Sequence, residues 1–273
     1  MAYSSELETA IRAARAAGEV IAGYYARGSV QVDLKADASP VTQADRDADA
    51  AIAAVIGAAF RDDAILSEET PDDEVRLSRS RVWIVDPLDG TRDFVQRTDD
   101  FAVHVALAVD GEPVVGAVFL PVTRALFAAS RGGGAWREVG GARERLHVSA
   151  TADLAALRLG VSRHHLSERL RACLDGAQIA SRIPIGASVK HMRVAAGELD
   201  AVINLSSGEL EWDTCAPEIV IREAGGVVTD GDGRPFRYNQ RDLEHTRGSV
   251  ASNGACHAEL VALLAPHLAP GPS

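Results

Sequence analysis

The chain has 273 residues, of which 47% are hydrophobic and only 5% aromatic, so it can bury a sizeable core that mixes helices with sheets. Its 39 acidic and 28 basic residues give a formal net charge of −11, and no run of Lys and Arg is present, which excludes a general nucleic-acid binder. The three cysteines are scattered and indicate reduced thiols. No signal-peptide pattern or apolar run of membrane-spanning length occurs, so we expect a cytoplasmic protein without a membrane partner.

Two helices are predicted near the N-terminus. The first carries an apolar stripe at helical spacing: Leu7, Ile11, Ala14, Ile21 and Tyr25. Ser5 and Glu8 predict a capping box at its start, and Gly28 predicts its end. The polar segment from Val32 to Pro40 is typical of a turn or hairpin. Thr42 is then expected to be the N-cap of the second helix, whose members include Asp45, Asp49, Ile52, Val55 and Ala59.

Strands dominate the next section. Ala64–Ser67 predicts a short strand that ends at Glu68 and Glu69, and the continuously apolar Val82–Val85 predicts a buried strand. Further strands are expected at Phe101–Val109, Val114–Leu120 and Ala125–Ala129, with an Asp110-Gly111 hairpin turn between the first two. The run Gly132–Gly134 lacks the Lys and Ser/Thr of a P-loop, so we interpret it as a connection between strands.

The second half alternates between strands and helices. The expected strands are Leu157–Val161 and Ala201–Leu205, and the expected helices are Leu166–Leu174, Ser188–Ala196, Cys215–Ala224 and Ala255–Leu264. Antiparallel hairpins followed by alternating α and β elements indicate an α/β (α+β) protein with two stacked sheets separated by helices. We treat residues 1–273 as a single catalytic unit, with an antiparallel-sheet half at 1–147 that holds most metal ligands and an α/β half at 148–273.

The sequence Asp86-Pro87-Leu88-Asp89-Gly90-Thr91 directly follows the Val82–Val85 strand. Two carboxylates at a buried strand end are costly unless something neutralises them. Proline fixes the bend, and glycine lets backbone amides approach a ligand closely. Thr91 adds a hydroxyl where the exposed amides of a helical turn attract phosphate oxygens.

Glu68 and Asp213 lie in similar settings, the one after a strand and the other ahead of the Cys215–Ala224 helix. If both converge with Asp86 and Asp89, four negative charges share one pocket, and their repulsion calls for divalent cations. A set of oxygen ligands favours Mg²⁺, then Mn²⁺ or Ca²⁺, over zinc. Bound cations would also reconcile an acidic protein with an anionic substrate.

Four separated motifs span nearly the whole chain: Pro40-Val41-Thr42 with Asp45, Glu68-Glu69, Asp86–Thr91 with Phe94, and Trp212-Asp213 with Ala216 and Pro217. Together they resemble the inositol monophosphatase superfamily. The resemblance implies a layered αβαβα sandwich, two or three Mg²⁺ ions, lithium sensitivity, a homodimer and a small, anionic phosphorylated metabolite as substrate.

The resemblance also implies a role for each residue. One magnesium, which activates the water, would be held by Glu68, Asp86 and the carbonyl of Leu88, and the other by Asp86, Asp89 and Asp213. Thr91 and Asp45 would orient the attacking water and take its proton. The phosphate would lie on the amides of Gly90 and Thr91, with Asp89 and Asp213 also facing the substrate.

Within the superfamily, two stretches resemble the 3′(2′),5′-bisphosphate nucleotidases, which act on 3′-phosphoadenosine 5′-phosphate, a by-product of sulfate assimilation. Tyr238–Asp242 resembles a Tyr-Asn-Lys-Glu-Asp stretch, and Gly186–Lys190 resembles the substrate loop, in which Ser188 and Lys190 would face the nucleotide. The arginine that many relatives carry before the Trp-Asp motif is absent from Asn204–Gly208. Inositol phosphate or fructose 1,6-bisphosphate as substrate, and a noncatalytic metal and nucleotide sensor, are the alternatives.

Other conspicuous residues have simpler interpretations. We interpret His164 and His165 as solvated loop histidines, because no second metal-binding cluster accompanies them. His104 is expected to be a core or edge residue of its strand, and Cys215 a small buried side chain without a partner histidine. For Tyr238 and Asn239, contact with a ligand competes with an ordinary role in a turn.

Overall fold

The computed structural model describes residues 2–28, 31–35, 40–164, 166–179, 181–206 and 208–268. The helices are α1 (Ser4–Arg27), α2 (Gln43–Ala59), α3 (Thr91–Gln96), α4 (Glu168–Gly176), α5 (Val189–Ala195), α6 (Glu211–Glu223) and α7 (His257–Leu264). The first strands are β1 (Val32–Leu34), β2 (Pro40–Thr42), β3 (Ala64–Ser67), β4 (Arg81–Asp89), β5 (Ala102–Val109), β6 (Glu112–Leu120) and β7 (Ala125–Ser130). The others are β8 (Gly134–Val139), β9 (Ala142–Arg145), β10 (Arg158–Ser162), β11 (Ser181–Ile185), β12 (Ala201–Asn204), β13 (Val227–Asp230) and β14 (Ser249–Ser252). Short 3₁₀ turns are present at Val75–Ser78, Leu154–Ala156 and Ala265–His267.

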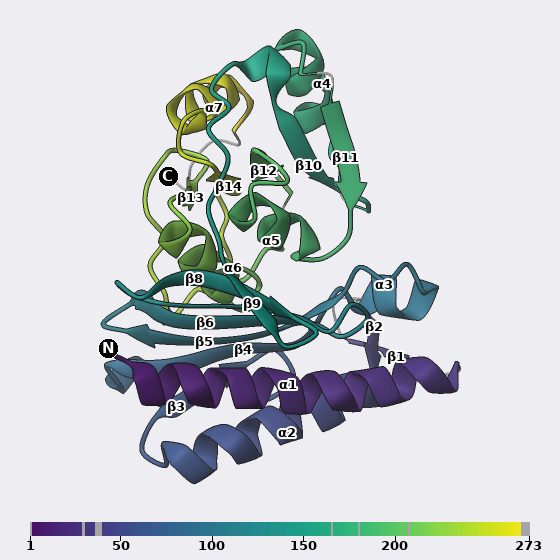
Figure 1. Cartoon of the computed structure of the whole chain (residues 1–273), viewed down its shortest axis with the longest axis vertical. Coiled ribbons are helices and arrows are strands. Elements are labelled where there is room, and N and C mark those ends of the chain that lie inside the picture. Colours follow the sequence, from purple (N-terminus) through teal and green to yellow (C-terminus); the bar gives the residue numbers. More distant parts are fainter. Residues whose placement is uncertain are drawn as a thin grey trace.

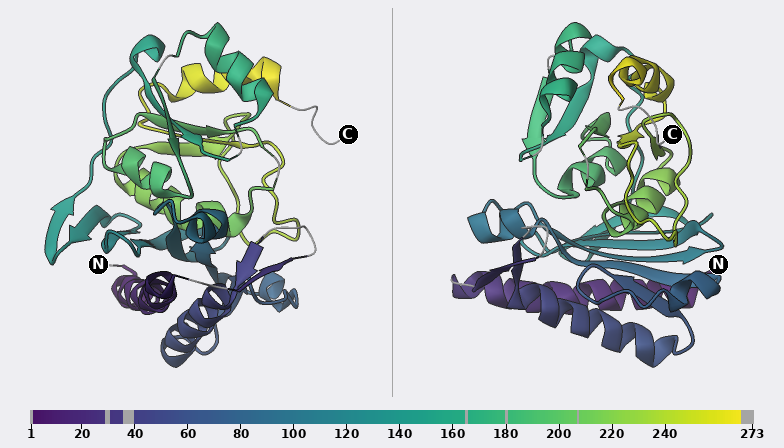
Figure 2. Two further views of the ribbon diagram at one scale, coloured as in Figure 1. Left: turned by 90° about the vertical axis from the view of Figure 1, so that its right-hand side faces the viewer. Right: turned by 180° about the vertical axis from the view of Figure 1, so that it is seen from behind.

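Two main sheets alternate with layers of helices (Figures 1 and 2). The larger sheet has seven strands in the order β3-β4-β5-β6-β7-β8-β9, and only the β3–β4 pair is parallel. The smaller sheet has five strands in the order β11-β10-β12-β14-β13 and is mixed. Helices α1 and α2 cover the outer face of the larger sheet, α5 and α6 lie between the sheets, and α4 and α7 cover the far face of the smaller one. The αβαβα sandwich is therefore confirmed.

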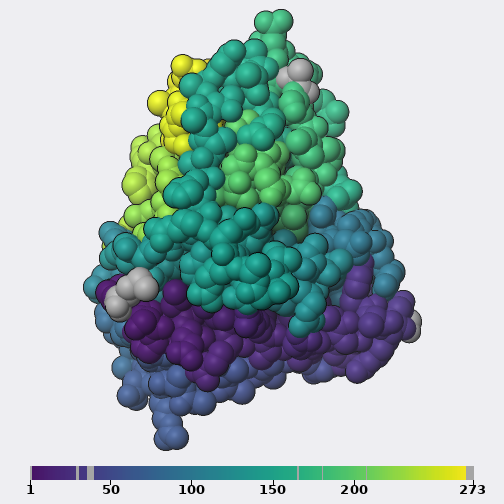
Figure 3. Space-filling view, viewed as in Figure 1, coloured from purple at the N-terminus to yellow at the C-terminus, as the bar shows by residue number. Residues whose placement is uncertain are grey.

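The layers form because the main helices and strands bury apolar faces against one another. Three apolar clusters fill the spaces between the five layers, and one of them extends from the larger sheet through the α5 and α6 layer to the smaller sheet. The space-filling view shows the N-terminal residues at the broad end of the molecule and the C-terminal residues toward the narrow end (Figure 3). Among the described residues, no helix is both long enough and apolar enough to cross a membrane.

Helix α1 packs closely on the sheet through small residues. Its buried face is Thr9, Ala10, Ala13, Ala14, Ala17, Gly18 and Ile21. The helix ends at Gly28, which takes a left-handed conformation with φ of 81°, as expected. The capping box expected at Ser5 is wrong. The helix begins at Ser4 after Tyr3, so Ser5 already lies in the first turn, and its hydroxyl bonds to Glu6.

Helix α2 begins as the sequence predicts. Thr42 is its N-cap, and the Asp45 side chain accepts from the Thr42 backbone amide in a capping box. The hairpin expected between Val32 and Pro40 is partly described: β1 pairs antiparallel with β2, and residues 36–39 lie outside the described residues.

Helix α6 lies almost against the larger sheet. A Cβ on Gly116 of β6 would be 2.4 Å from the Ile219 side chain and 2.8 Å from the Ala216 carbonyl oxygen, so only glycine permits this spacing. The helix begins at Glu211, earlier than expected, and Asp213 therefore lies within its first turn and not ahead of it.

The sequence pattern missed several strands of the second half. Strand β11 contains Pro184 and forms the edge of its sheet, where a proline is tolerated but weakens an alternating pattern. Strands β13 and β14, of four residues each, were also missed. The Gly132–Gly134 segment does connect β7 with β8, as expected.

The fit of α1 on the sheet can be tested at Gly18. A Cβ there would lie 2.2 Å from a ring carbon of the buried Phe119, so Gly18→Ala should lower the free energy of unfolding by about 1–3 kcal/mol. Gly23 is on the same helix, but a Cβ at that position would meet nothing within 4 Å, so Gly23→Ala should raise stability by up to about 1 kcal/mol. Urea unfolding of both variants measures this, and equal effects would contradict the packing described.

Candidate active site

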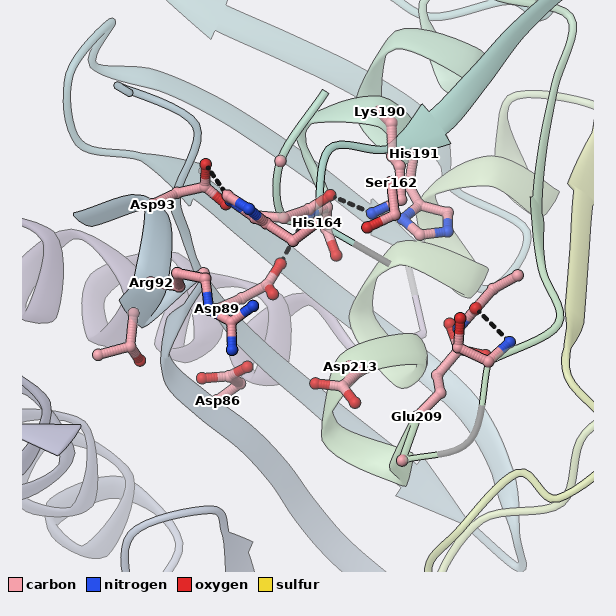
Figure 4. Close-up of a pocket in the computed structure, with 18 of the residues that line it drawn as sticks. Asp86, Asp89, Arg92, Asp93, Ser162, His164, Lys190, His191, Glu209 and Asp213 are labelled. Atoms are coloured by element: carbon pink, nitrogen blue, oxygen red, sulfur yellow. Dashed lines mark hydrogen bonds and ion pairs between the residues drawn. The ribbon is translucent and has the colours of Figure 1, made fainter. Parts of the chain in front are cut away.

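A cavity of about 510 Å³ opens where both halves of the chain meet, at the end of β4 and the starts of α3, α5 and α6. Figure 4 shows its lining, in which Asp86, Asp89 and Asp213 come from opposite walls toward the same space. The sequence-predicted residues that line it are Glu68, Asp86, Leu88, Asp89, Gly90, Thr91, Ser188, Lys190 and Asp213. The remaining candidate, Asp45, lies directly behind Thr91.

Three carboxylates form the centre of the cavity. Asp86, Asp89 and Asp213 each offer an oxygen atom, and these atoms all lie within 4.8 Å of one another. Glu68 lies beside them on the cavity wall, where its Oε1 atom is 2.7 Å from Nζ of Lys35. The same ammonium group is 2.7 Å from Glu69, so Lys35 neutralises part of this acidic wall. The convergence predicted from the sequence therefore holds for the three aspartates, with Glu68 adjacent.

Backbone amides orient two of the carboxylates. Oδ1 of Asp86 accepts from the amide of Leu88 at 3.0 Å, which the bend at Pro87 makes possible. Oδ2 of Asp213 accepts from the amide of Leu210 at 2.7 Å, as the third residue of a capping arrangement at the start of α6. Each bond is local in sequence, so the two motifs orient their own aspartates.

Asp89 is oriented by residues that are distant in sequence. Its Oδ2 atom accepts from the amide of Ser188 at 2.6 Å and lies 3.3 Å from Nε2 of His104. Burial by itself would raise the pKa of Asp89, but the charges of His104 and Lys190 and the Ser188 bond outweigh it and lower that pKa. Asp89 is therefore the member of the cluster that stays ionised most readily.

The other two aspartates behave in the opposite way. Burial raises the pKa of Asp86 well above its usual range, and repulsion from Glu68, Asp89 and Asp213 adds to the effect. Burial and repulsion from Asp89 and Glu68 likewise raise the pKa of Asp213. Cations would relieve this repulsion, and a cluster of carboxylate oxygens without Cys ligands fits a hard divalent ion such as Mg²⁺.

Thr91 and Asp45 form a hydrogen-bonded pair on the cavity wall. Oγ1 of Thr91 donates to Oδ1 of Asp45 at 2.9 Å and also lies 3.1 Å from the carbonyl oxygen of Leu88. Oδ2 of Asp45 accepts from the Thr42 amide at 2.8 Å and from its hydroxyl at 2.6 Å. Burial raises the pKa of Asp45, while the bonds from the two threonines oppose that shift.

The turn at Gly90 brings the two halves into contact. Gly90 has a φ of 88°, and a Cβ there would lie 2.8 Å from the Ala187 side chain and 3.0 Å from the Asp100 carbonyl oxygen. No other residue type fits this position without strain. The loop that precedes α5 is thereby held against the Asp86–Thr91 segment, with Ser188 beside Asp89.

Two basic groups also line the cavity, and one of them, Lys190, is near enough to Asp89 to lower the pKa of that carboxyl. Nζ of Lys190 donates to the Ala187 carbonyl oxygen at 2.5 Å and remains part of the lining. Arg92 is exposed at the mouth and has no hydrogen-bond or ion-pair partner among the described residues. Sequence reasoning missed Arg92, although its place directly after Thr91 was a signal that could have indicated it.

Several other lining residues were missed or misinterpreted. His164 is not a solvated loop residue: it lines the cavity, and its Nε2 atom lies 3.0 Å from Oδ1 of Asp93 (Figure 4). His165 lies outside the described residues. His104 and Cys215 are fully buried, as expected, although His104 also contacts the cluster. The polar lining residues that were missed are Arg92, Asp93, Ser162, His164, His191, Asn204, Ser206 and Glu209.

The Tyr238-Asn239 stretch is not part of the cavity lining, so a role there in ligand contact is wrong. Tyr238 is fully buried, and its hydroxyl donates to Glu218 at 2.6 Å. The amides of Asn239 and Gln240 donate to the Glu211 carboxylate at 2.6 and 2.7 Å. Burial nevertheless raises the pKa of Glu211 to about 7. The stretch therefore supports the start of α6, two residues ahead of Asp213.

The fold and this acidic cavity define a phosphatase of the inositol monophosphatase type. Residues 3–269 match the model of the inositol monophosphatase family, and the chain belongs to that family of metal-dependent phosphatases. The resemblance seen in the four motifs is thus confirmed.

Particular relatives differ in what they act on. The chain is 35% identical to the 3′(2′),5′-bisphosphate nucleotidase CysQ of Escherichia coli K12 over 239 residues, which are 86% of this chain and 95% of the relative. It is 32% identical to a histidinol-phosphatase of Chlorobaculum parvum over 268 residues, which are 95% of this chain and 96% of the relative. The crystal structure of CysQ from Bacteroides thetaiotaomicron aligns with a TM-score of 0.78 at 33% identity, covering 92% of this chain and 98% of that one.

Metal binding should depend on pH. Because the pKa values of Asp86 and Asp213 are raised in the folded protein, metal-free stability should fall as the pH rises from about 4 through those raised values. Mg²⁺ displaces these protons, so it should bind more tightly at pH 8 than at pH 5.5. At a 100-fold excess over its Kd it should stabilise the protein by about 2.7 kcal/mol, measured as a rise in Tm.

The variant Asp213→Asn tests whether the acidic cluster is the site at which Mg²⁺ binds. It removes one negative charge from the cluster, so the metal-free variant should be more stable than the wild type at pH 8 and should gain much less from Mg²⁺. A wild-type response of this variant to Mg²⁺ would show that the cluster does not bind the ion.

Proposed function

We propose that the protein is a Mg²⁺-dependent phosphomonoesterase and 3′(2′),5′-bisphosphate nucleotidase, which converts 3′-phosphoadenosine 5′-phosphate to AMP and phosphate. The observation that carries the proposal is the convergence of Asp86, Asp89 and Asp213 beside the Thr91–Asp45 pair. An acidic cluster alone binds cations, but a buried carboxylate behind a hydroxyl also offers a proton acceptor.

Each part of the acidic cluster has a place in this proposal. Glu68, Asp86 and the carbonyl of Leu88 would hold one magnesium, and Asp86, Asp89 and Asp213 would hold the second. When bound, the two ions supply Lewis acidity for an attacking water and charge neutralisation for the leaving oxygen. The amides of Gly90 and Thr91 hold the phosphate oxygens, since Gly90 allows close approach of the backbone.

The Thr91–Asp45 pair orients the water and takes up its proton. Both oxygens of Asp45 are held by hydrogen bonds, so the carboxylate cannot rotate away from Thr91. Its raised pKa makes it a better proton acceptor than a solvated aspartate. The intact pair is also what argues against a noncatalytic sensor, because binding alone does not require it.

The rest of the cavity supports a substrate with a second anionic group. Its volume of about 510 Å³ far exceeds what one phosphate needs, and Lys190 and Arg92 add positive charge to its lining. A second phosphate there would meet a cation, as a buried anion requires. The CysQ relatives favour the same substrate class. Inositol phosphate and fructose 1,6-bisphosphate remain the alternatives, because they need the same metal cluster.

One observation favours a different substrate, whose alcohol part carries an ammonium group. Glu209 is a buried carboxyl on the cavity wall, and its Oε2 atom has no hydrogen-bond partner among the described residues. An ammonium group on the substrate would satisfy it, which suits histidinol phosphate, the substrate class suggested by the name of one relative. We therefore include histidinol phosphate as the second candidate substrate.

Asp45→Asn should separate chemistry from binding. The asparagine keeps the shape of the side chain but cannot take up a proton, so kcat should fall by about 10²–10⁴-fold. Mg²⁺ affinity, measured by calorimetry, should change little because Asp45 is not a ligand. Asp47→Asn, on the same helix but outside the cavity, should keep wild-type turnover. Near-normal turnover of Asp45→Asn would refute the dyad.

A substrate panel at saturating Mg²⁺ tests the specificity. Phosphate release should be fastest with 3′-phosphoadenosine 5′-phosphate, compared with inositol 1-phosphate, fructose 1,6-bisphosphate and histidinol phosphate. Lys190→Ala should reduce kcat/KM for the nucleotide by about 1.5–3 kcal/mol, the range for a hydrogen bond to a charged group, and should barely affect inositol 1-phosphate. Arg92→Ala should also reduce kcat/KM for the nucleotide more than for inositol 1-phosphate.

Arg193→Ala is the matched control, since Arg193 is a basic residue of the same helix that does not line the cavity. It should leave both substrates unaffected. Equal losses on both substrates for Lys190→Ala would mean that Lys190 supports the metals, since it also acts on Asp89. Faster release from histidinol phosphate than from the nucleotide would overturn the nucleotidase assignment.

A further inference from the structure

His104 is a buried imidazole in direct contact with the acidic cluster. It lies in the middle of β5, where its register partner on β4 is Asp86. The side chain is 0% exposed, and its strand neighbours Val103 and Val105 are also fully buried. A leucine would suit such a position, so a polar ring here needs polar partners to offset its burial.

The two ring nitrogens of His104 contact two different motifs. Nδ1 lies 3.1 Å from the carbonyl oxygen of Trp212, which can only accept, so Nδ1 donates this bond. Nε2 lies 3.3 Å from Oδ2 of Asp89, at ion-pair distance, and makes no hydrogen bond among the described residues. Trp212 directly precedes Asp213, so one rigid ring joins the Asp86–Thr91 segment to the first turn of α6.

This contact also decides which oxygen of Asp89 is available. Oδ2 already accepts from the Ser188 amide at 2.6 Å, and His104 approaches the same atom. With Oδ2 engaged by the protein, the carboxylate cannot rotate freely, and Oδ1 is left for another partner. Asp89 and Asp213 repel each other, and a ring fixed to both segments resists their separation.

We propose that His104 is a positioning residue, which holds Asp89 and the start of α6 at the spacing that a shared cation requires. This inference rests on the proposed metal site, but not on the identity of the substrate. Groups that orient metal ligands from behind typically change metal affinity by 10–100-fold when they are removed. The effect of losing His104 should therefore appear as weaker Mg²⁺ binding.

Two conservative variants separate the two contacts. The amide nitrogen of asparagine reaches the place of Nδ1, so His104→Asn can retain the bond to Trp212 alone. The amide nitrogen of glutamine reaches the place of Nε2, so His104→Gln can retain the contact with Asp89. His104→Leu keeps the volume and loses both contacts.

Two measurements test the variants. Calorimetry measures Mg²⁺ binding without substrate, and a phosphate-release assay measures how activity depends on the Mg²⁺ concentration. In His104→Leu, the Mg²⁺ ion that binds with the lower affinity should bind about 10–100-fold less tightly than in the wild type. The kcat should largely recover at saturating Mg²⁺, and the KM for the substrate should not change. His104→Gln should lie closer to the wild type than His104→Asn. His257→Gln, whose ring contacts Thr229 and Ser252 outside the cavity, controls for the loss of a half-buried imidazole.

Wild-type Mg²⁺ affinity in both His104→Asn and His104→Gln would overturn the inference, and so would a loss no larger than that of His257→Gln. If His104→Leu does not fold, the variants His104→Asn and His104→Gln still test the role of His104. Wild-type protein that binds Mg²⁺ but releases no phosphate would refute the proposed function alone. Failure of the wild type to bind Mg²⁺ would refute the metal site and this inference together.

Discussion

Repulsion among buried carboxylates is the constraint on which the rest of this structure depends. Asp86, Asp89 and Asp213 place their oxygen atoms within 4.8 Å of one another, with Glu68 alongside. Without cations, such a cluster opposes folding, and it persists because its members are held by groups that cannot easily move. Much of the architecture around the cavity serves to hold these charges together.

The holding groups come from every layer near the cavity. The bend after β4 supplies the Leu88 amide to Asp86, and the start of α6 supplies the Leu210 amide to Asp213. Helix α6 is itself brought close to the sheet by Gly116 of β6. The stability of the fold, provided by its three apolar clusters, thus offsets an electrostatically unfavourable centre.

The same arrangement separates two functions within one cavity. The aspartates have opposite pKa shifts, because Asp89 faces His104 and Lys190 while Asp86 and Asp213 face other carboxylates. The acidic cluster suits cations, and Lys190 and Arg92, which line the same cavity, suit an anionic part of a substrate. A strongly acidic protein can in this way accept an anionic metabolite.

The sequence by itself determined the local devices, the Thr42 cap and the bend that orients Asp86, because these follow from residues near one another in the chain, where spacing dictates geometry. It indicated the family and the αβαβα fold through the resemblance of its four motifs, and it gave the convergence of the aspartates as a hypothesis that the structure confirmed. Only the tertiary structure decided that Ser188 and His104 hold Asp89, that His164 and Arg92 line the cavity, and that Tyr238 does not. Those contacts join segments tens of residues apart, and their distances depend on how whole layers pack, which no local pattern encodes.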